Sequence, residues 1–454
     1  MMRLVFLLFL LFVSSFCLAA PQDPFPNPAD FPVPEGYESN VRFWMRVYGE
    51  WSDNQVVIHD SQNMDVVFDV LDYPDENSLL LSAARAGLSQ RIGEIKAILL
   101  DLNAERSAVE KSPEHKRISD LYKNNFDPDK FRKAAENLRV QQGIKDRFER
   151  GLEQMTRYID QIQQVLRDEG IPEEIGYLPL VESSFNNESL SKTRAAGIWQ
   201  FMPATGRLYM KVNSDVDERL DPYVATRAAA RYLKRSYQLF GNWPVALMSY
   251  NHGQQGRVNA MKQVGTADFI TILTRYEGKY FGFASRNFYA EFIAACRVMK
   301  DAEKYFQGLE YNDPLTHTSV KLPNAVYVST VLSRTGLSRE ALREYNPALQ
   351  SRVIFSRRPI PAGYELRLPA SNFPNPETLV AALRMQNPGT SPATYSTPAT
   401  PDGSFGKKTY VVRKGDTLFS ISQRFSTTVD AIRRLNGLSH TTIVPGQTLH
   451  VPLR

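Results

Sequence analysis

Residues 387–407 divide this chain into parts that fold separately. The segment is rich in Pro, Thr, Ser and Gly, and such a composition cannot bury enough apolar surface to form a core. We expect a disordered linker whose ends lie on the order of 25 Å apart on average. The 454 residues of the chain also exceed what one hydrophobic core holds together. The sequence therefore predicts a multidomain protein.

One short sequence pattern occurs on each side of the linker, at residues 315–370 and 408–454. Its matching segments are Leu342–Asn346, Ile360–Gly363 and Leu366–Pro369 in the first copy, and Ile432–Asn436, Val444–Gly446 and Leu449–Pro452 in the second. We interpret them as a degenerate copy and a well-formed copy of one small module. The second copy predicts a strand, two helices and a closing strand (βααβ), with a tight turn at Gly415 and a helix capped by Asp416 or Thr417.

Apolar residues at helical spacing predict that residues 136–310 are mostly α-helical. Apolar residues recur at three- and four-residue steps, as in one long helix ending near Gly170. They are Val140, Ile144, Phe148, Leu152, Met155, Ile159, Ile162 and Leu166. Asp221–Pro222 is typical of an N-cap followed by Pro in a first turn, and a last helix is expected from about Asn287 to Asp301. Residues 37–135 predict a mixed, partly helical region with strand-like clusters at Val56–Ile58 and Val66–Phe68.

Residues 1–20 have the features of an export signal. Arg3 precedes an apolar run from Leu4 to Leu18, and the small residues Ala19 and Ala20 follow. We expect cleavage between these two alanines. The Pro-rich arm that follows, at 21–36, cannot be helical, and we expect it to be extended. An uncleaved signal, or a lipid on Cys17, would instead attach the chain to a membrane. Removing the signal leaves Cys296 alone, so no internal disulfide is possible.

Composition and charge exclude several functions. The 54 basic and 49 acidic residues give a net charge of +5, and no basic run indicates a nucleic-acid partner. The six histidines show no metal-ligand spacing, and the sequence has no phosphate-cradling glycine loop. We therefore expect a monomer with no metal, no cofactor and no nucleic acid.

Three short segments contain the candidate chemistry. Leu180–Phe185 contains Glu182 and Ser183, Gly197–Met202 contains Gln200 and Phe201, and Ser249–Gly253 contains Tyr250 and Asn251. Burial of a glutamate among apolar and amide-bearing neighbours raises its pKa, and a proton held near neutral pH is what a general acid needs. Each segment alone would be ordinary core or surface. Their order and spacing together resemble the catalytic motifs of the lytic transglycosylases, lysozyme-like enzymes that cut the glycan strands of peptidoglycan.

The whole organisation resembles the membrane-bound lytic murein transglycosylase D family. The resemblance implies a mostly α-helical, lysozyme-like catalytic domain at 136–310 plus small α+β modules, in an exported, periplasmic protein associated with the cell wall or attached to the outer membrane. Residues 408–454 resemble the lysin motif (LysM), which implies binding of N-acetylglucosamine-containing chains through Gly415, Asp416, Thr417, Leu418, Ile443 and Pro445. For the copy at 315–370, which lacks a Gly-Asp-Thr-Leu turn, glycan binding stays open.

The resemblance also implies a reaction with one catalytic acid. Glycosidases commonly use two carboxylates, whereas here Glu182 would serve first as acid and then as base, closing a 1,6-anhydro ring on the muramic acid. By the same resemblance, six further residues are expected to hold the acid or the sugar: Ser183, Gln200, Phe201, Tyr250, Asn251 and Tyr289. The sequence departs from the family at His252, which stands where alanine is usual, and at Phe288, which moves the tyrosine to position 289.

Two other interpretations remain open. A hydrolase of the goose-type lysozyme sort would share the fold and activate water with a second carboxylate, for which the nearest candidates are Asp215, Asp217, Glu218 and Asp221. Alternatively, the chain would be a peptidoglycan-binding scaffold whose helical region is inert.

Overall fold

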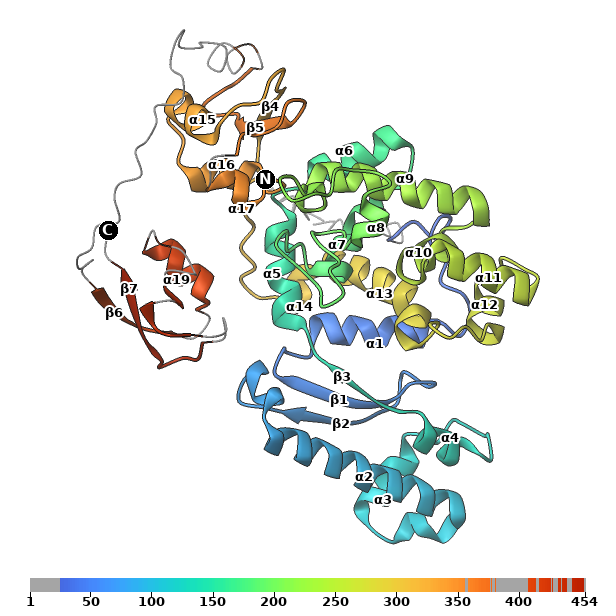
Figure 1. Cartoon of the computed structure of the whole chain (residues 1–454). Coiled ribbons are helices and arrows are strands. Elements are labelled where there is room, and N and C mark those ends of the chain that lie inside the picture. The colour runs from blue at the N-terminus through green and yellow to red at the C-terminus, as the bar shows by residue number, and fades with distance from the viewer. Residues whose placement is uncertain are drawn as a thin grey trace, which may run out of the picture. The chain divides into compact units, whose positions relative to one another are not determined.

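The computed structural model describes residues 25–375 except 356 and 357, residues 377 and 380, and residues 407–452 except 414, 415, 426, 428–431, 434 and 439–442. The chain forms two compact units, one up to residue 384 and one from residue 385 onward (Figure 1). The expected linker at 387–407 lies outside the described residues except for its last residue, and so does the expected signal at 1–20.

The Pro-rich arm is packed against helices from residue 25 onward. Phe31 is 1% exposed, and its ring centroid lies 5.3 Å from that of Phe292 and 6.2 Å from that of Trp243. The arm leads into α1 (Glu38–Gly49), which packs along α13 (Phe283–Lys300). This part of the chain therefore belongs to the folded helical region, where we expected only an extended segment.

A three-stranded antiparallel sheet joins the N-terminal region to the helical region. Its order is β2 (Val67–Asp72), β1 (Gln55–Asp60) and β3 (Leu138–Gln142). Successive side chains of a strand point to opposite faces. Ile58 accordingly faces a core formed with the helices on one side, whereas Val57 belongs to the main helical core on the other. Because β3 pairs with β1, the boundary that we expected at residue 136 falls inside a continuous structure.

Helices cover the outer face of this sheet. They are α2 (Ser82–Ala104), α3 (Pro113–Asp120) and α4 (Lys130–Glu136), with the 3-10 helices η1 (Glu76–Leu80) and η2 (Arg106–Glu110). Ile95 and Leu99 of α2 are fully buried against Phe68 of the sheet. This layer forms a core of its own.

The main helical region contains the three candidate segments. Its elements are α5 (Lys145–Met155), α6 (Ile159–Glu169), η3 (Glu173–Tyr177), α7 (Leu178–Ser183), α8 (Pro203–Gly206), η4 (Glu218–Leu220), α9 (Pro222–Phe240), α10 (Trp243–His252), α11 (Gln254–Val264), α12 (Phe269–Arg275), α13 and α14 (Ala302–Tyr305). The single helix predicted from Val140 to near Gly170 was wrong, because Val140 lies in β3 and the helix breaks between Met155 and Ile159. The predicted N-cap at Asp221 is confirmed.

The degenerate module is docked on the helical region within the same unit. It contains β4 (His317–Lys321), α15 (Val328–Thr335), α16 (Arg339–Tyr345), α17 (Ser351–Ile354) and β5 (Glu365–Pro369), with β4 and β5 antiparallel. Val216 of the helical region contributes to the core of this module. Arg367 of β5 forms a buried ion pair with Asp221, which also caps α9.

The second unit contains the well-formed copy of the module. Strands β6 (Lys407–Val411) and β7 (Thr448–Pro452) pair antiparallel, and α19 (Leu418–Arg424) follows the first strand. Its core includes Tyr410, Ile421, Ile432 and Val451. The strand pairing and first helix agree with the predicted βααβ order.

Candidate active site

Glu182 lies in the last turn of a short helix with a tightly bent end. The chain runs from η3 into α7, and Pro179 stands in the first turn of α7. Proline is tolerated there because a first-turn N–H has no intrahelical acceptor, and it marks a junction between two short helices. Ser184 and Phe185 then adopt φ angles of 50° and 54°, a region that side chains other than glycine rarely occupy.

Burial keeps Glu182 protonated near neutral pH. The surrounding atoms raise its pKa to about 8 because they exclude the water that would stabilise the carboxylate. The pKa values of the Tyr48 and Tyr250 phenols are raised by burial and, to a smaller degree, by the charge of Glu182. These two tyrosines therefore lie close to the acid. The raised pKa agrees with the sequence-based expectation and suits a general acid.

Hydrogen bonds tie the second segment to the helix that carries the acid. The Ser183 hydroxyl donates to the Ile198 carbonyl oxygen at 2.9 Å. The Gln200 amide nitrogen donates to the Gly197 carbonyl oxygen at 2.8 Å, and Gln200 itself has a φ of 47°. Ser183 and Gln200 thus hold the backbone on either side of the site in place.

A buried arginine organises the same loop. Arg219 is 5% exposed, and its guanidinium donates to the carbonyl oxygens of Arg194 at 2.7 Å and Phe201 at 2.9 Å. Asp217 accepts two further hydrogen bonds from it. Gly197 lies against the Arg219 backbone with a φ of +78°, where an added Cβ would lie 1.8 Å from the carbonyl oxygen. Only glycine fits at this position.

The aromatic residues of the segments are mostly core. Trp199 is fully buried, and its indole N–H donates to Thr226 Oγ1 at 2.8 Å. Phe201 is 3% exposed, whereas Met202 is 43% exposed. The Tyr250 hydroxyl donates to the Trp199 carbonyl oxygen at 2.7 Å. Of these residues, only Met202 therefore reaches the surface.

Asn251 and its neighbour end α10 beside the start of α13. The Asn251 side chain is exposed, and its Oδ1 accepts a hydrogen bond from the Ser285 hydroxyl at 2.9 Å. The ring of His252 turns aside and contacts Tyr276 and Phe281 edge-on. The unusual histidine thus packs against α12 and the loop after it, and Asn251 keeps an oriented amide at the site.

Tyr289 does not reach the site. It is fully buried, its ring stacks on Tyr37, and its hydroxyl donates to the Pro32 carbonyl oxygen at 2.9 Å. The prediction that Tyr289 binds the sugar was wrong, because the arm covers this tyrosine and buries its hydroxyl.

Each of the four acids considered for a second catalytic role is engaged elsewhere. Asp217 is paired with Arg219 at 2.7 Å, and Asp221 is paired with Arg367. Asp215 lies 3.1 Å from the Arg358 guanidinium and 3.4 Å from that of Arg352. Glu218 accepts the Lys211 backbone N–H at 2.6 Å. All four therefore stabilise the loop and the docked module.

Glu291 is a second half-buried acid that the sequence interpretation missed. It lies on α13, which packs against α7, and its pKa is raised to about 8 by burial and by the charge of Glu182. The Tyr48 phenol responds to the charges of both acids. The sequence did contain a signal for Glu291, because it is one acid inside the apolar run Phe288–Cys296. Carboxylates are rarely buried, so an acid at such a position indicates a special role.

The predicted LysM residues differ in their surroundings. Asp416 accepts hydrogen bonds from the Arg413 N–H at 2.8 Å and from the Tyr410 hydroxyl at 2.5 Å, which order the turn. Leu418 is 2% exposed and belongs to the core of the module. Thr417 and Pro445 are exposed, Ile443 is half-buried, and Gly415 lies outside the described residues.

The described residues contain no candidate metal site and no candidate membrane-spanning helix. Among these residues, no group of three or more His, Cys, Asp or Glu side chains is arranged to hold a metal ion. Within the same residues, no helix has both the length and the apolar character needed to cross a membrane.

Comparison with known proteins identifies two domains. Residues 161–273 match the family described as Transglycosylase SLT domain, and residues 410–452 match the LysM domain. The first match contains all three candidate segments, and the second coincides with the well-formed copy of the module.

Individual relatives extend these matches. Membrane-bound lytic murein transglycosylase D of Escherichia coli is 27% identical over 289 residues, which are 63% of this chain and 61% of that protein. The chain thus matches less than two thirds of that relative's length. A putative tributyltin chloride resistance protein of Alteromonas sp. is 32% identical over 103 residues, 22% of this chain and 49% of that protein. A solved structure of lytic transglycosylase Slt from Pseudomonas aeruginosa shares 18% identity over 34% of this chain and 26% of that chain, with a TM-score of 0.27.

Proposed function

We propose that this chain, a relative of membrane-bound lytic murein transglycosylase D with an SLT domain and a LysM domain, is a lytic transglycosylase. Its substrate would be the β-1,4 bond between N-acetylmuramic acid and N-acetylglucosamine in peptidoglycan. The observation that carries the proposal is Glu182, a half-buried acid whose pKa is raised to about 8 by the loss of surrounding water. The next residue, Ser183, is hydrogen-bonded to the Ile198 carbonyl oxygen, and the phenol of Tyr250 lies close enough for its pKa to respond to the charge of the acid.

The proposed reaction uses Glu182 twice. Its carboxylic acid protonates the bridging oxygen as the bond from that oxygen to C1 of the muramic acid breaks. The resulting carboxylate then removes the proton from the 6-hydroxyl of the same sugar, and O6 bonds to C1. Glu182 ends protonated, no water is consumed, and the product carries a 1,6-anhydro ring. Asn251 would contact the sugar, because its amide is exposed and oriented by Ser285.

A hydrolase would need a second carboxylate that is ionised and can activate water. Asp215, Asp217, Glu218 and Asp221 are engaged in structural contacts. Glu291 lies near Glu182, but burial raises its pKa to about 8 and so favours the neutral form at pH 7. These surroundings support the transglycosylase over the goose-type hydrolase, and Glu291 is the residue through which a hydrolase would have to act.

We also propose that the chain acts outside the cytoplasm at the cell wall. The apolar N-terminal segment and the LysM domain support this location. The LysM domain would bind glycan chains through the exposed Thr417 and Pro445 and the neighbouring turn, while the docked module at 315–370 would serve mainly to support the catalytic loop.

Cleavage and binding of purified peptidoglycan test this proposal together. Glu182→Gln is expected to reduce release of soluble fragments by a factor on the order of 10² to 10⁴, the usual contribution of a general acid, and to leave co-sedimentation with peptidoglycan unchanged. Glu303→Gln is the control, since Glu303 is exposed and lies outside the three candidate segments. Undiminished release by Glu182→Gln would show that another residue is the acid, and no release by the unaltered chain would favour the binding scaffold.

A further inference from the structure

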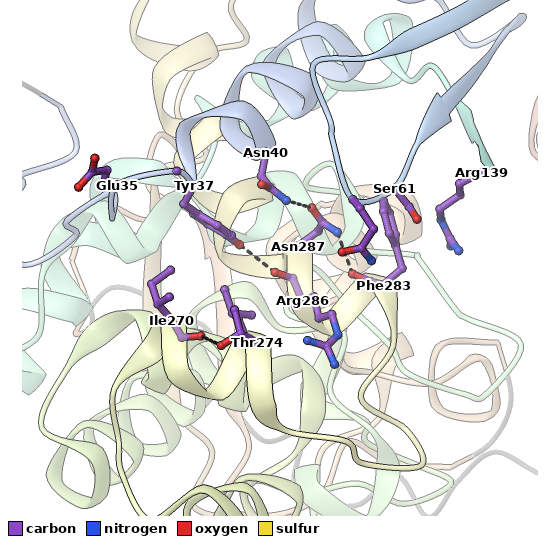
Figure 2. A pocket seen from close by; sticks show the side chains of 13 residues that line it. Glu35, Tyr37, Asn40, Ser61, Arg139, Ile270, Thr274, Phe283, Arg286 and Asn287 are labelled. Atoms are coloured by element: carbon purple, nitrogen blue, oxygen red, sulfur yellow. Dashed lines mark hydrogen bonds between the residues drawn. The ribbon is translucent and has the colours of Figure 1, made fainter. Parts of the chain in front are cut away.

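A pocket of about 690 Å³ opens between the sheet and the helical region. None of the four acids Asp215, Asp217, Glu218 and Asp221 lines it. Figure 2 shows the side chains that line it. They come from the start of α1, the β1–β2 turn, β3, α12 and α13, and include Tyr37, Asn40, Arg139, Phe283, Arg286 and Asn287.

Two arginine side chains supply the positive charge of the pocket. The Arg139 guanidinium lies 3.9 Å from the centroid of the Phe283 ring, and that of Arg286 lies 4.7 Å from the centroid of Phe281. Within the described part of the chain, neither guanidinium forms an ion pair; Arg286 donates one hydrogen bond, to the Tyr276 carbonyl oxygen at 2.9 Å. Partial burial lowers the pKa of both groups, although each stays a cation. Their remaining N–H donors are available to an anion.

The floor of the pocket is fixed in advance of binding. The Asn287 side-chain oxygen accepts hydrogen bonds from Asn40 at 2.9 Å and from the Trp44 indole at 3.2 Å, and its nitrogen donates to the Phe283 carbonyl oxygen. The Tyr37 hydroxyl donates to the Arg286 carbonyl oxygen at 2.8 Å (Figure 2). A ligand would therefore meet cations whose backbone is already ordered, which reduces the entropy lost on binding.

The first turn of α13 connects the pocket to the proposed active site. Ser285 holds the Asn251 amide on one side, and the next two residues, Arg286 and Asn287, line the pocket on the other. A polymer bound at Glu182 that carries side branches could thus place a branch in this pocket.

We propose that the pocket binds the acidic peptide branches of peptidoglycan, with Arg139 and Arg286 holding their carboxylates. This inference rests on the proposed function. A planar carboxylate matches the fork of a guanidinium in two parallel hydrogen bonds, while Ser61, Gln62 and Asn40 suit peptide amides. Glu35 is the acidic side chain on the rim, and it suits a free amino group on the same peptide. The volume lies within the range of ordinary ligand pockets.

Calorimetric titration of the full chain carrying Glu182→Gln tests the proposal without turnover. The probe is a soluble tripeptide of alanine, glutamate and diaminopimelate, beside the same peptide with its carboxylates amidated. Arg139→Gln and amidation are each expected to weaken binding by at least about 10-fold, the effect of losing one charged hydrogen bond. Arg235→Gln, an exposed arginine that does not line the pocket, is the control and should bind as before.

Three results would overturn the assignment: no binding of the acidic peptide, equal binding by Arg139→Gln and Arg235→Gln, or inorganic phosphate binding as tightly as the peptide. Cleavage then separates this inference from the proposed function. Arg139→Gln should slow cleavage of peptide-bearing strands and spare strands stripped of peptide. If the unaltered chain binds the peptide but cleaves neither polymer, the proposed function fails and the pocket assignment survives.

Discussion

Replacing Glu182 with Gln is expected to change how the stability of the fold depends on pH. The ordinary pKa of this side chain is 4.5, and burial raises it to about 8 in the folded protein. Between these two values the folded state holds a proton that the unfolded state has released. Stability therefore falls as pH rises through this window, because unfolding is favoured by the release of that proton. Glutamine has no proton to lose and does not contribute to this fall.

The magnitude follows from the size of the shift. One unit of pKa difference corresponds to about 1.4 kcal/mol, so the advantage of Glu182→Gln over the unaltered chain should grow by about 4 kcal/mol between pH 5 and pH 8. The contribution of Glu291, whose pKa is also raised, is present in both proteins and largely cancels in the comparison.

Urea unfolding at pH 5, 6, 7 and 8 measures this difference directly. The two proteins should be closest in stability at pH 5 and diverge steadily above it. Glu303→Gln, at an exposed position, should follow the unaltered chain at every pH. Parallel curves for Glu182→Gln and the unaltered chain would refute the reasoning, since they would mean that Glu182 is solvated and ionised in the folded state.

Three further predictions concern other parts of the chain. Arg367→Met leaves Asp221 buried without its cation and should destabilise the docked module by about 3–5 kcal/mol, measured by thermal unfolding; a loss below about 1 kcal/mol would show that the pair is solvated. Glu291→Gln leaves in place the burial that raises the pKa of Glu182 and should leave the alkaline limb of the cleavage rate near its original pH, whereas a clear move to lower pH would show that the charge of Glu291 also raises the pKa of the acid. Deleting 408–454 should weaken co-sedimentation with peptidoglycan and leave turnover of soluble fragments intact; an equal loss of both would contradict a role in tethering.

Local sequence patterns predicted the helices better than their ends. The apolar stripe from Phe148 to Leu166 correctly marked buried positions except Ile159, which is half-buried, but nothing in it signalled the break after Met155. The break is stabilised by bonds from distant residues: the Thr156 hydroxyl lies 2.8 Å from the Asn312 carbonyl oxygen, and the Leu315 N–H donates to the Arg157 carbonyl oxygen. Such tertiary contacts leave no trace in hydrophobic periodicity.

The site was predicted where its chemistry depends on near neighbours in sequence. Glu182 and its raised pKa followed from the residues around it, and the capping role of Asp221 followed from Pro222. Tyr289 was misplaced and Glu291 was missed because both depend on what packs against α13. That packing includes the N-terminal arm, whose contact with the helices could not be read from its prolines.

Mass spectrometry of the fragments released from purified peptidoglycan tests the central claim most directly. The account predicts fragments that end in 1,6-anhydro-muramic acid, lighter by one water than reducing ends, from the unaltered chain and from Glu303→Gln but not from Glu182→Gln. Reducing ends in place of anhydro ends would contradict it, because they would show that water attacks C1 and that a second carboxylate, with Glu291 the nearest candidate, takes part in the reaction.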